Sequence, residues 1–400
     1  MEKSWNFIWD NFFCEKTNLL YDYLVRNIDG NILTDHLPSV NEINRQIPNA
    51  CGWGTGMEDS VLSAGSMIDA IVARYNVTRD KNMKPFADKV FDGMMRCVVD
   101  FENGFISRSV SPADEKSFYY DTSRDQFTHW VYGGLRLYNS ELADAEQKEN
   151  IKKVIVAVAK RMERNCLPSN DYNFLRYDGE TSIAGKMRGV LGAHEYMRLP
   201  FFYIAAWYVS GDNHWYDLYM QYRDEAFKKQ SKFNALSYGL RCYPVLQMQY
   251  SLRAIYDIDP DYEFRAKCLE FMQSVADYYK TFAVSESKRI CDEIGEEHYY
   301  YQYKPWNKVR MLYQGIIGNR PYFNPAQSEM SENRGFYHIR NVGEAVSILA
   351  LCPDFKIGEE QFAALQNLND AIDYDRICNY SPMLLVCGWW LLKEANLFNN

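Results

Sequence analysis

The sequence predicts an all-α fold, a toroid of six helical hairpins written (α/α)6. Two observations carry this prediction. Apolar residues recur with helical periodicity along the 400-residue chain, and no stretch shows the regular alternation of a sheet. Candidate helices also alternate between a charge-rich kind and an almost wholly apolar kind, with a pair every ~60 residues. Because a helix that is apolar all round must be enclosed, closing the pairs into a ring would bury one helix of each pair.

The charge-rich helices are expected on the outside of the ring. The segment from Lys148 to Arg164 shows the pattern clearly, since its charged residues gather on one side. In chain order, the outer helices are predicted at residues 4–25, 83–101, 147–166, 213–229, 261–282 and 358–372.

The apolar helices are expected to line the ring from within. They are predicted at residues 57–75, 124–138, 192–209, 236–256, 335–351 and 381–394, all within a single domain of residues 1–400. Several of them follow long connections, at residues 29–56, 104–123, 168–188 and 284–333. Loops of that length inside a domain are usually functional, so we expect the active cleft at the N-terminal ends of the inner helices.

Composition narrows the class of partner. A net charge of −9 without a long basic run argues against nucleic acid and against an anionic membrane surface. The 31 Tyr and 9 Trp residues offer flat faces with polar tips, which suit sugar rings as well as helix packing. The ten cysteines form no CxxC pair, so neither a zinc ribbon nor a disulfide framework is indicated.

The N-terminal segment, residues 1–20, is predicted to be an amphipathic helix and lacks the apolar stretch of a signal peptide. The compartment stays open: cytoplasmic if Met1 is native, periplasmic if a leader has been removed. No segment has the roughly 18 to 20 uninterrupted apolar residues of a spanning helix, so no membrane partner is expected. The oligomeric state is not predicted.

The first group of candidate catalytic residues lies where Cys51-Gly-Trp-Gly-Thr-Gly-Met-Glu-Asp-Ser60 enters an inner helix. Trp53 offers a flat surface for a substrate. Glu58 and Thr55 have the spacing of a capping box, so a reciprocal cap is the alternative role for Glu58. Asp59 is not needed for that box; its alternative role is a carboxylate favoured by the helix dipole.

The second group opens the next inner helix, in Asp121-Thr-Ser-Arg-Asp-Gln-Phe-Thr-His129. Ser123 and Gln126 again have capping-box spacing, which leaves Asp125 unexplained. Asp125, His129, Tyr132 and Arg136 fall on one helix face. Such a polar face inside a ring needs a water-filled centre or complete pairing. The alternative to a functional role is an ion pair of Arg124 with Asp121 or Asp125.

Further candidates for substrate binding are spread along the chain. The arginines among them suit a bidentate clamp on a carboxylated sugar. With Trp53, Asp121, Arg124 and His129, the predicted binding set contains Arg188, His194, Glu195, Tyr238, Arg241, Trp306, Arg334 and His338.

No cofactor or metal is predicted. The six histidines lack HExxH or another close ligand spacing, and the chain has no GxxxxGK[ST] phosphate loop, GxSxG elbow or strand-linked GxGxxG. Carboxylate chemistry is therefore favoured.

At Gly54–Ser60 and Thr122–His129, and in its overall plan, the sequence resembles the six-hairpin glycosidase superfamily, especially bacterial unsaturated glucuronyl and rhamnogalacturonyl hydrolases. The chain has Ser123-Arg-Asp-Gln126 where those hydrolases place an aspartate beside tryptophan. The resemblance implies an (α/α)6 barrel whose central cleft binds an oligosaccharide. It also implies inner-helix aspartates as acid and base; Asp125 matches best by position, with Asp59 as its partner.

We therefore expect a glycoside hydrolase that acts on short oligosaccharides, with uronic-acid-containing ones as a candidate class. Asp125 is predicted as the acid, and Asp59 or Glu58 as the base. One alternative is a polysaccharide lyase or sugar epimerase that uses His129, His194 or a tyrosine to abstract a proton. Another is a non-catalytic glycan-binding protein whose carboxylates are caps and ion pairs.

Overall fold

The structure is a computed structural model that describes residues 1–26, 32–33, 37–238, 241–296, 300, 304–326, 329 and 335–398. The described chain is mainly helical, and its strands occur only in short antiparallel pairs. The predicted all-α class is confirmed.

Helices that were predicted to be internal pack against one another in a closed cycle. In the described chain, α3 packs on α5, α5 on α7, α7 on α10, α10 on α13, α13 on α15, and α15 returns to α3. This order is compatible with a helical toroid. These inner helices are α3 (Ser60–Thr78), α5 (Arg124–Tyr138), α7 (Arg198–Ser210), α10 (Tyr243–Ile258), α13 (Gly335–Leu351) and α15 (Ser381–Phe398).

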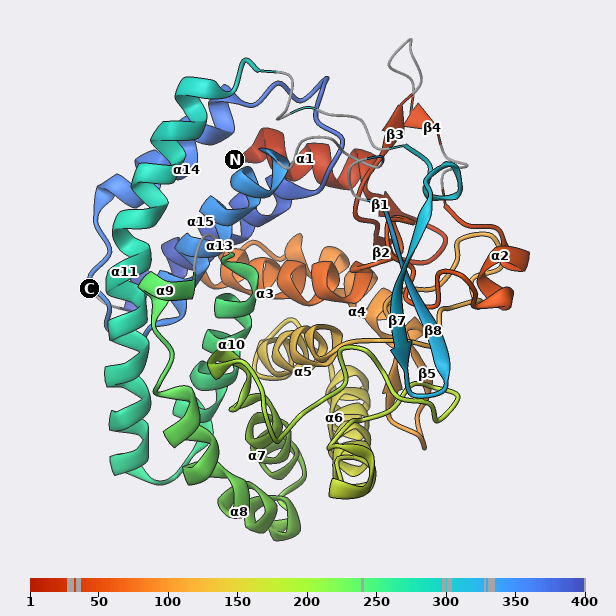
Figure 1. The fold of residues 1–400 in the computed structure, drawn as a ribbon. Helices are drawn as coiled ribbons and strands as arrows, with labels where there is room; N and C mark the ends of the chain where they lie inside the picture. Colours follow the sequence, from red (N-terminus) through yellow and green to blue (C-terminus); the bar gives the residue numbers. More distant parts are fainter. Residues whose placement is uncertain are drawn as a thin grey trace.

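A second set of helices covers the first from outside. α1 and α14 pack on α15, α4 on α3, α6 on α5 and α7, α8 on α7, and α11 on α10 and α13. Figure 1 shows α8 and α11 at the periphery and α3, α5 and α10 nearer the middle. The outer helices are α1 (Glu2–Asn11), α4 (Met83–Arg96), α6 (Ala145–Asn165), α8 (Asn213–Gln230), α11 (Tyr262–Glu293) and α14 (Glu359–Ala371).

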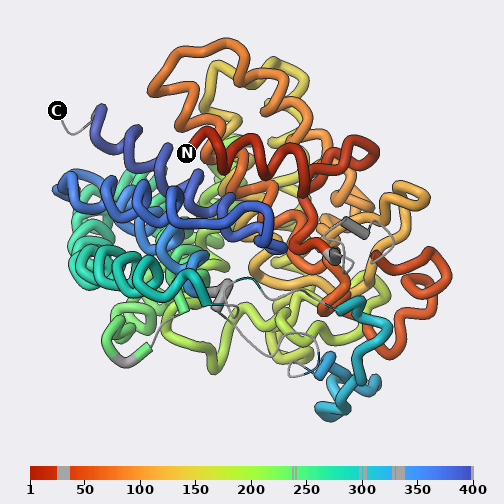
Figure 2. The backbone as a smooth tube through the Cα atoms, turned by 90° about the horizontal axis from the view of Figure 1, so that it is seen from above, coloured from red at the N-terminus to blue at the C-terminus, as the bar shows by residue number. Residues whose placement is uncertain are grey.

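The two ends of the chain meet, since α1 runs alongside α15 (Figure 2). The main buried apolar cluster accordingly extends from Trp5 in α1 to Leu392 in α15. Short helical segments complete the connections: α2 (Val40–Arg45), η2 (Pro168–Asn170), η3 (Ala193–Glu195), α9 (Ala235–Tyr238) and η5 (Trp306–Lys308).

Glycine allows two pairs of inner helices to touch backbone to backbone. A Cβ atom at Gly65 in α3 would lie 2.3 Å from the carbonyl oxygen of His129 in α5. A Cβ atom at Gly343 in α13 would lie 2.3 Å from the carbonyl oxygen of Leu384 in α15. Side chains at these positions would force the helices apart, so the spacing of each pair depends on the missing Cβ.

Two outer helices end earlier than predicted, because an antiparallel strand pair follows each of them. The helix predicted at residues 4–25 stops at Asn11, and the chain turns between β1 (Phe13–Cys14) and β2 (Leu19–Leu20), with Asn18 in the left-handed conformation at φ 56°. The helix predicted at residues 83–101 stops at Arg96. There β5 (Val98–Asp100) pairs with β6 (Phe105–Ile106), as the adjacent β-branched Val98 and Val99 favour. A third pair joins β3 (Val25–Arg26) and β4 (Ile32–Leu33).

The connection predicted at residues 284–333 begins later than predicted and contains a strand pair. α11 continues to Glu293, and a hairpin of β7 (Met311–Ile317) and β8 (Arg320–Pro325) follows. A two-residue Gly318-Asn319 turn joins its strands, a dipeptide that signals a hairpin between apolar runs. Arg320 fixes the hairpin to Asp178 at 3.0 Å.

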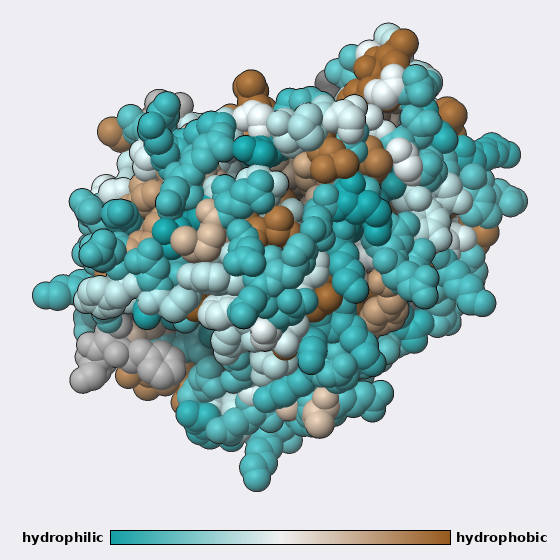
Figure 3. All heavy atoms as spheres, turned by 90° about the horizontal axis from the view of Figure 1, so that it is seen from below, coloured by the Kyte–Doolittle hydropathy of each residue, from teal (hydrophilic) through white to brown (hydrophobic). Residues whose placement is uncertain are grey.

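The surface seen from below is mostly hydrophilic, with scattered apolar residues (Figure 3). No helix in the described chain combines the length and apolarity needed to cross a bilayer.

Candidate functional site

Contacts between the first turns of the inner helices show that these helices start at the same end of the ring. Gln126 of α5 bonds to Asp59 at the start of α3, Arg198 of α7 bonds to Asp125 of α5, and Arg340 of α13 bonds to Tyr380 before α15. We call this end the mouth. The positive ends of several helix dipoles converge there, which favours carboxylates.

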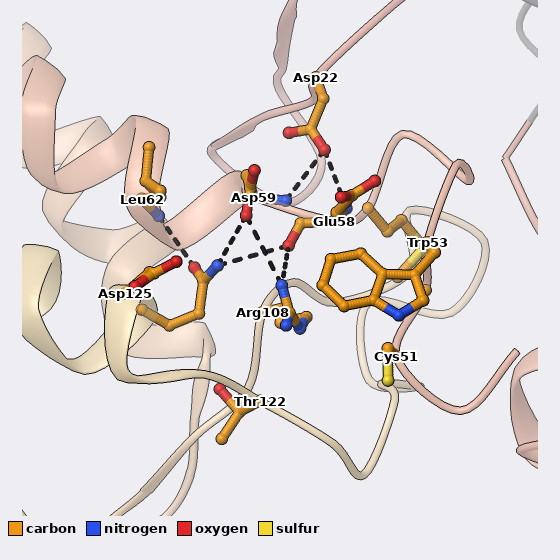
Figure 4. Close-up of polar contacts among 12 residues, drawn as sticks. Asp22, Cys51, Trp53, Glu58, Asp59, Leu62, Arg108, Thr122 and Asp125 are labelled. Atoms are coloured by element: carbon orange, nitrogen blue, oxygen red, sulfur yellow. Dashed lines mark hydrogen bonds and ion pairs between the residues drawn. The ribbon is translucent and has the colours of Figure 1, made fainter. Parts of the chain in front are cut away.

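Asp59 lies at the N-cap of α3 but makes no side-chain cap. Its Oδ1 accepts a hydrogen bond from Gln126 Nε2 at 2.9 Å and lies 3.6 Å from Arg108 Nη1 (Figure 4). The side chain is 22% exposed. Burial and the nearby charge of Asp125 raise the pKa of Asp59, although Arg108 and Arg340 oppose the rise.

Glu58 does not form the predicted capping box with Thr55, because α3 begins only at Ser60. Instead, the backbone N–H of Gly54 donates to Glu58 Oε2 at 2.9 Å, and the Thr55 hydroxyl accepts from the N–H of Met57. Burial, followed by the charge of Asp59, raises the pKa of Glu58 to about 7. Glu58 therefore carries a proton part of the time near neutral pH.

Asp22 is a third carboxyl group beside this pair, and the sequence did not point to it. Its Oδ2 accepts the backbone N–H groups of Glu58 at 3.0 Å and Asp59 at 2.9 Å (Figure 4). Burial, then the charges of Asp59 and Glu58, raises the pKa of Asp22 well above its usual value. Asp22 thus fixes the backbone that carries both predicted carboxylates, from a position too remote in sequence for any local motif to reveal.

Asp125 occupies the first turn of α5, as predicted, and its side chain is 29% exposed. Its Oδ1 accepts a hydrogen bond from Arg198 Nη1 at 2.7 Å. Burial alone would raise the pKa of Asp125, but the charge and hydrogen bond of Arg198, with the charge of Arg124, bring it below the usual value. Asp125 is therefore held in its ionised form.

Gln126 connects the two helices that carry Asp59 and Asp125. The predicted capping box with Ser123 is wrong, because Ser123 makes no side-chain cap. Gln126 Oε1 instead accepts the N–H of Leu62 at 3.0 Å, while Nε2 donates to Asp59. The long-range pairing outweighs the local one because it satisfies a free N–H in the first turn of α3.

Trp53 and Arg108 form one side of the site. The Arg108 guanidinium lies 4.4 Å from the centroid of a Trp53 ring, and its Nη1 donates to the Glu58 carbonyl at 3.1 Å (Figure 4). Arg108 is 2% exposed, and no described residue forms a hydrogen bond with its buried Nε and Nη2. The sequence identified Trp53 and the functional loop at residues 104–123, but not Arg108 itself.

A second side of the site brings together Arg124, His194, Glu195 and Tyr238. The expected pairing of Arg124 with Asp121 or Asp125 is wrong: Arg124 pairs with Glu195 at 2.5 Å. His194 Nε2 lies 3.3 Å from the Tyr238 hydroxyl, and burial lowers the pKa of His194 to about 4. His194 is therefore neutral at pH 7.

His129 lies below the mouth and is almost fully buried, which corrects its prediction as a substrate contact. Its Nδ1 lies 3.1 Å from the Ser66 hydroxyl, and burial lowers its pKa to about 3. One turn further down α5, Tyr132 stacks on Tyr250 with ring centroids 4.1 Å apart. At this depth aromatic side chains fill the centre of the ring. The water-filled centre that was one of the two expectations is therefore not present at this level.

Several predicted binding residues lie away from the carboxylates. Asp121 is buried and accepts a hydrogen bond from Cys51 Sγ at 3.2 Å, so no substrate reaches it. Arg188 pairs with Glu225 of the outer helix α8 at 2.9 Å. Trp306 is buried in η5, ahead of the β7–β8 hairpin. Arg241 is exposed just before α10.

His338 lies in the first turn of α13 and pairs with Glu286 of α11 at 2.8 Å. Although burial opposes it, hydrogen bonding by His338 and Arg289 lowers the pKa of Glu286 to about 2. These contacts give His338 a role in joining α13 to α11. Arg334 lies outside the described residues.

Arg340 and Glu344 form a buried pair within α13 that the sequence analysis missed. Arg340 Nε donates to Glu344 Oε1 at 2.6 Å, and Nη1 donates to the Tyr380 hydroxyl at 2.6 Å. The charge of Arg340 also reaches Asp59. The available signal was an Arg and a Glu four residues apart in a helix predicted to be enclosed.

Comparison with known proteins gives no family: no protein-family model matches the chain, and no curated protein matches it. Within the described ranges, no group of three or more His, Cys, Asp or Glu side chains is placed to hold a metal ion.

Proposed function

We propose that this chain is a glycoside hydrolase of the six-hairpin type, a single (α/α)6 domain that cleaves short oligosaccharides at the mouth. One observation carries the proposal. Asp59 and Asp125 start neighbouring inner helices, both are partly exposed, and their environments shift their pKa values in opposite directions. A pair of carboxyl groups with separated pKa values is what acid and base catalysis of glycoside cleavage requires.

The pKa directions favour an exchange of the roles that the sequence suggested. Asp59, with the raised pKa, serves as the acid that protonates the departing glycosidic oxygen. Asp125, which Arg198 keeps ionised, serves as the base that activates water, or as the nucleophile. Glu58 is given no direct catalytic role, because its Oε2 is occupied by the N–H of Gly54.

The surrounding side chains suit a sugar. Trp53 supplies an aromatic surface, and Arg124, His194, Glu195 and Tyr238 supply hydrogen-bonding groups for hydroxyls. Arg108 places a positive charge beside Trp53 and 3.6 Å from Asp59, and this charge attracts a negatively charged sugar to this side of the site. The charge supports uronic-acid-containing oligosaccharides as the substrate class.

His194 supports a second candidate, a lyase or epimerase on the same scaffold. His194 is neutral at pH 7, so it can accept a proton, and the Tyr238 hydroxyl lies 3.3 Å away. A neutral histidine beside a tyrosine is suited to general acid–base catalysis. In that reaction the carboxylates at the mouth would bind the substrate, and His194 would remove the proton beside a carboxylate or carbonyl group.

Product analysis across a broad panel of neutral and uronic-acid-containing oligosaccharides tests the proposal. We expect shorter saccharides with new reducing ends, and the initial anomer reports whether the reaction inverts or retains. A product that absorbs ultraviolet light indicates a lyase, and an isomerised, uncleaved sugar indicates an epimerase. Binding without turnover across the panel contradicts both enzymes and supports a glycan-binding protein.

A further inference from the structure

A hollow of about 150 Å³ lies at the end of the ring opposite the mouth. It is formed where α5, α10, α13 and α15 end. The lining residues used below are Tyr132, Arg136, Arg253, Asp354, Glu394 and Ala395. We call it the distal hollow. None of the residues proposed for catalysis at the mouth contributes to it.

Both arginines of the distal hollow are fixed on one edge and unpaired on another. Arg136 donates from Nε to Asp69 at 2.6 Å and from Nη2 to Glu394 at 2.5 Å. Arg253 donates from Nε to Asp257 at 2.8 Å and from Nη1 to the Leu351 carbonyl at 3.1 Å. In the described chain the remaining nitrogens, Arg136 Nη1 and Arg253 Nη2, make no hydrogen bond, and the two side chains are 24% and 30% exposed. Each guanidinium is thus held in a fixed orientation, and one of its nitrogens remains able to donate a hydrogen bond to a ligand.

The charged side chains that line the distal hollow balance one another, because Arg136 and Arg253 are matched by Glu394 and Asp354. Asp69 and Asp257 lie behind the arginines as their ion-pair partners and add two further carboxylates. The carboxylates and the C-terminal helix ends make an anion unfavourable, although two arginines are present. The spare guanidinium donors make a cation unfavourable as well. A neutral ligand with many hydroxyl groups can use the donors and the acceptors together.

We propose that the distal hollow binds one neutral sugar ring, or a cyclic polyol of the same size. A cavity of about 150 Å³ accommodates a single six-membered ring. The spare edges of Arg136 and Arg253 would donate to hydroxyl oxygens, and Asp354 would accept from hydroxyl groups. The site lies across the ring from the proposed catalytic carboxylates and does not depend on them.

The test uses the full chain and saturation-transfer NMR with D-glucose, D-galactose, D-mannose and myo-inositol. Sodium sulfate and ethylammonium chloride serve as charged probes in calorimetry.

Three variants change the distal hollow. Arg253→Met removes an unpaired donor, Ala395→Trp fills the hollow, and Asp354→Asn removes an acceptor charge. Asn is well suited to position 354, where the backbone is left-handed at φ 57°. Trp53→Ala and Asp59→Asn are the matched changes at the mouth.

We expect at least one neutral probe to bind, with affinity lowered fivefold or more by Arg253→Met and by Asp354→Asn and abolished by Ala395→Trp. The two mouth variants should leave this binding unchanged. Three results would overturn the proposal: no neutral probe binds, binding is lost in the mouth variants instead, or a charged probe binds more tightly than every neutral one. Because the readout is binding of single rings, it is independent of whether the mouth cleaves glycans. Asp354→Asn keeps the test decisive if Arg253→Met or Ala395→Trp fails to fold.

Discussion

Arg198, the first residue of α7, holds the carboxylate of Asp125 in the first turn of α5 by a 2.7 Å hydrogen bond and ion pair. A second bond, from Nη2 to Gln247 at 2.5 Å, ties the same guanidinium to α10. Arg198 is 1% exposed, whereas Asp125 still reaches solvent. One buried cation therefore joins three inner helices and sets the protonation state of the proposed base.

Replacing Arg198 by Met should lower the free energy of unfolding by about 3 kcal/mol, because it leaves a largely buried carboxylate without its partner. Activity should also need a higher pH, since the pKa of Asp125 rises when Arg198 is lost. Urea unfolding and a pH–rate profile measure the two effects. In the double variant with Asp125→Asn, the destabilisation should be less than the sum of the single changes; additive values would contradict a direct pairing.

Asp59→Asn and Asp125→Asn should each reduce kcat on a cleaved oligosaccharide by about 10²- to 10⁴-fold, the range for loss of a general acid or base. The melting temperature should change little in Asp59→Asn, whose side chain is partly exposed, but should fall in Asp125→Asn, because the buried Arg198 loses its ion-pair partner. Asp217→Asn, at an exposed position on α8, is the matched control. Wild-type rates in both mouth variants would remove the proposed mechanism.

Asp59→Asn should lower the pKa of Asp22. After burial, the charge of Asp59 is the largest cause that raises the pKa of Asp22, and the amide in the variant carries no charge. The hydrogen bonds from the N–H groups of Glu58 and Asp59 to Asp22 stay in place, because they come from the backbone. Carboxyl-carbon NMR of Asp22 measures the shift without turnover. An unchanged Asp22 titration would contradict the electrostatic coupling of the two carboxyl groups.

His129 should make the protein less stable in acid. Its folded pKa is lowered to about 3 from the usual 6.5, so between these values the unfolded chain binds a proton that the folded chain excludes. Stability therefore rises with pH across this window, by up to about 1.4 kcal/mol per pH unit for this one group. In His129→Gln, the slope of unfolding free energy against pH should fall by that amount. An unaltered slope would mean that His129 titrates normally.

Gly65→Ala should destabilise the chain by about 3 kcal/mol, at the upper end for overpacking, since its Cβ would meet the His129 carbonyl oxygen at 2.3 Å. Gly295→Ala is the control, because a Cβ there meets no atom of the described residues within 4 Å. Thermal unfolding distinguishes them. Equal melting temperatures would mean that α3 and α5 do not touch at Gly65.

The fold was predictable where periodicity was long. The bounds of α5 and α13 were predicted to the residue, because their apolar pattern is uninterrupted, whereas α1 was extended past Asn11 into a turn that Asn18 makes possible. The β7–β8 hairpin was not predicted, because its strands lack a regular apolar–polar alternation and only the Gly318-Asn319 turn marks it in the sequence.

The site was predictable only for residues that break a local pattern. Asp59 and Asp125 stood out at the starts of apolar helices. Asp22, Arg108 and Arg340 did not, because their importance comes from contacts between distant segments. Its spacing from Ser123 suggested that Gln126 forms a local capping box. The hydrogen bond from Gln126 to Asp59 joins distant segments, so no local spacing could predict it.

The polar face of α5 places Asp125 at one end of the ring and Tyr132 and Arg136 at the other. A single helix of 15 residues is thus a common wall of the mouth and the distal hollow. If ligands bind at both openings, a displacement of α5 by one ligand would move the groups that contact the other. Linkage would then require each ligand to change the other's affinity by the same factor.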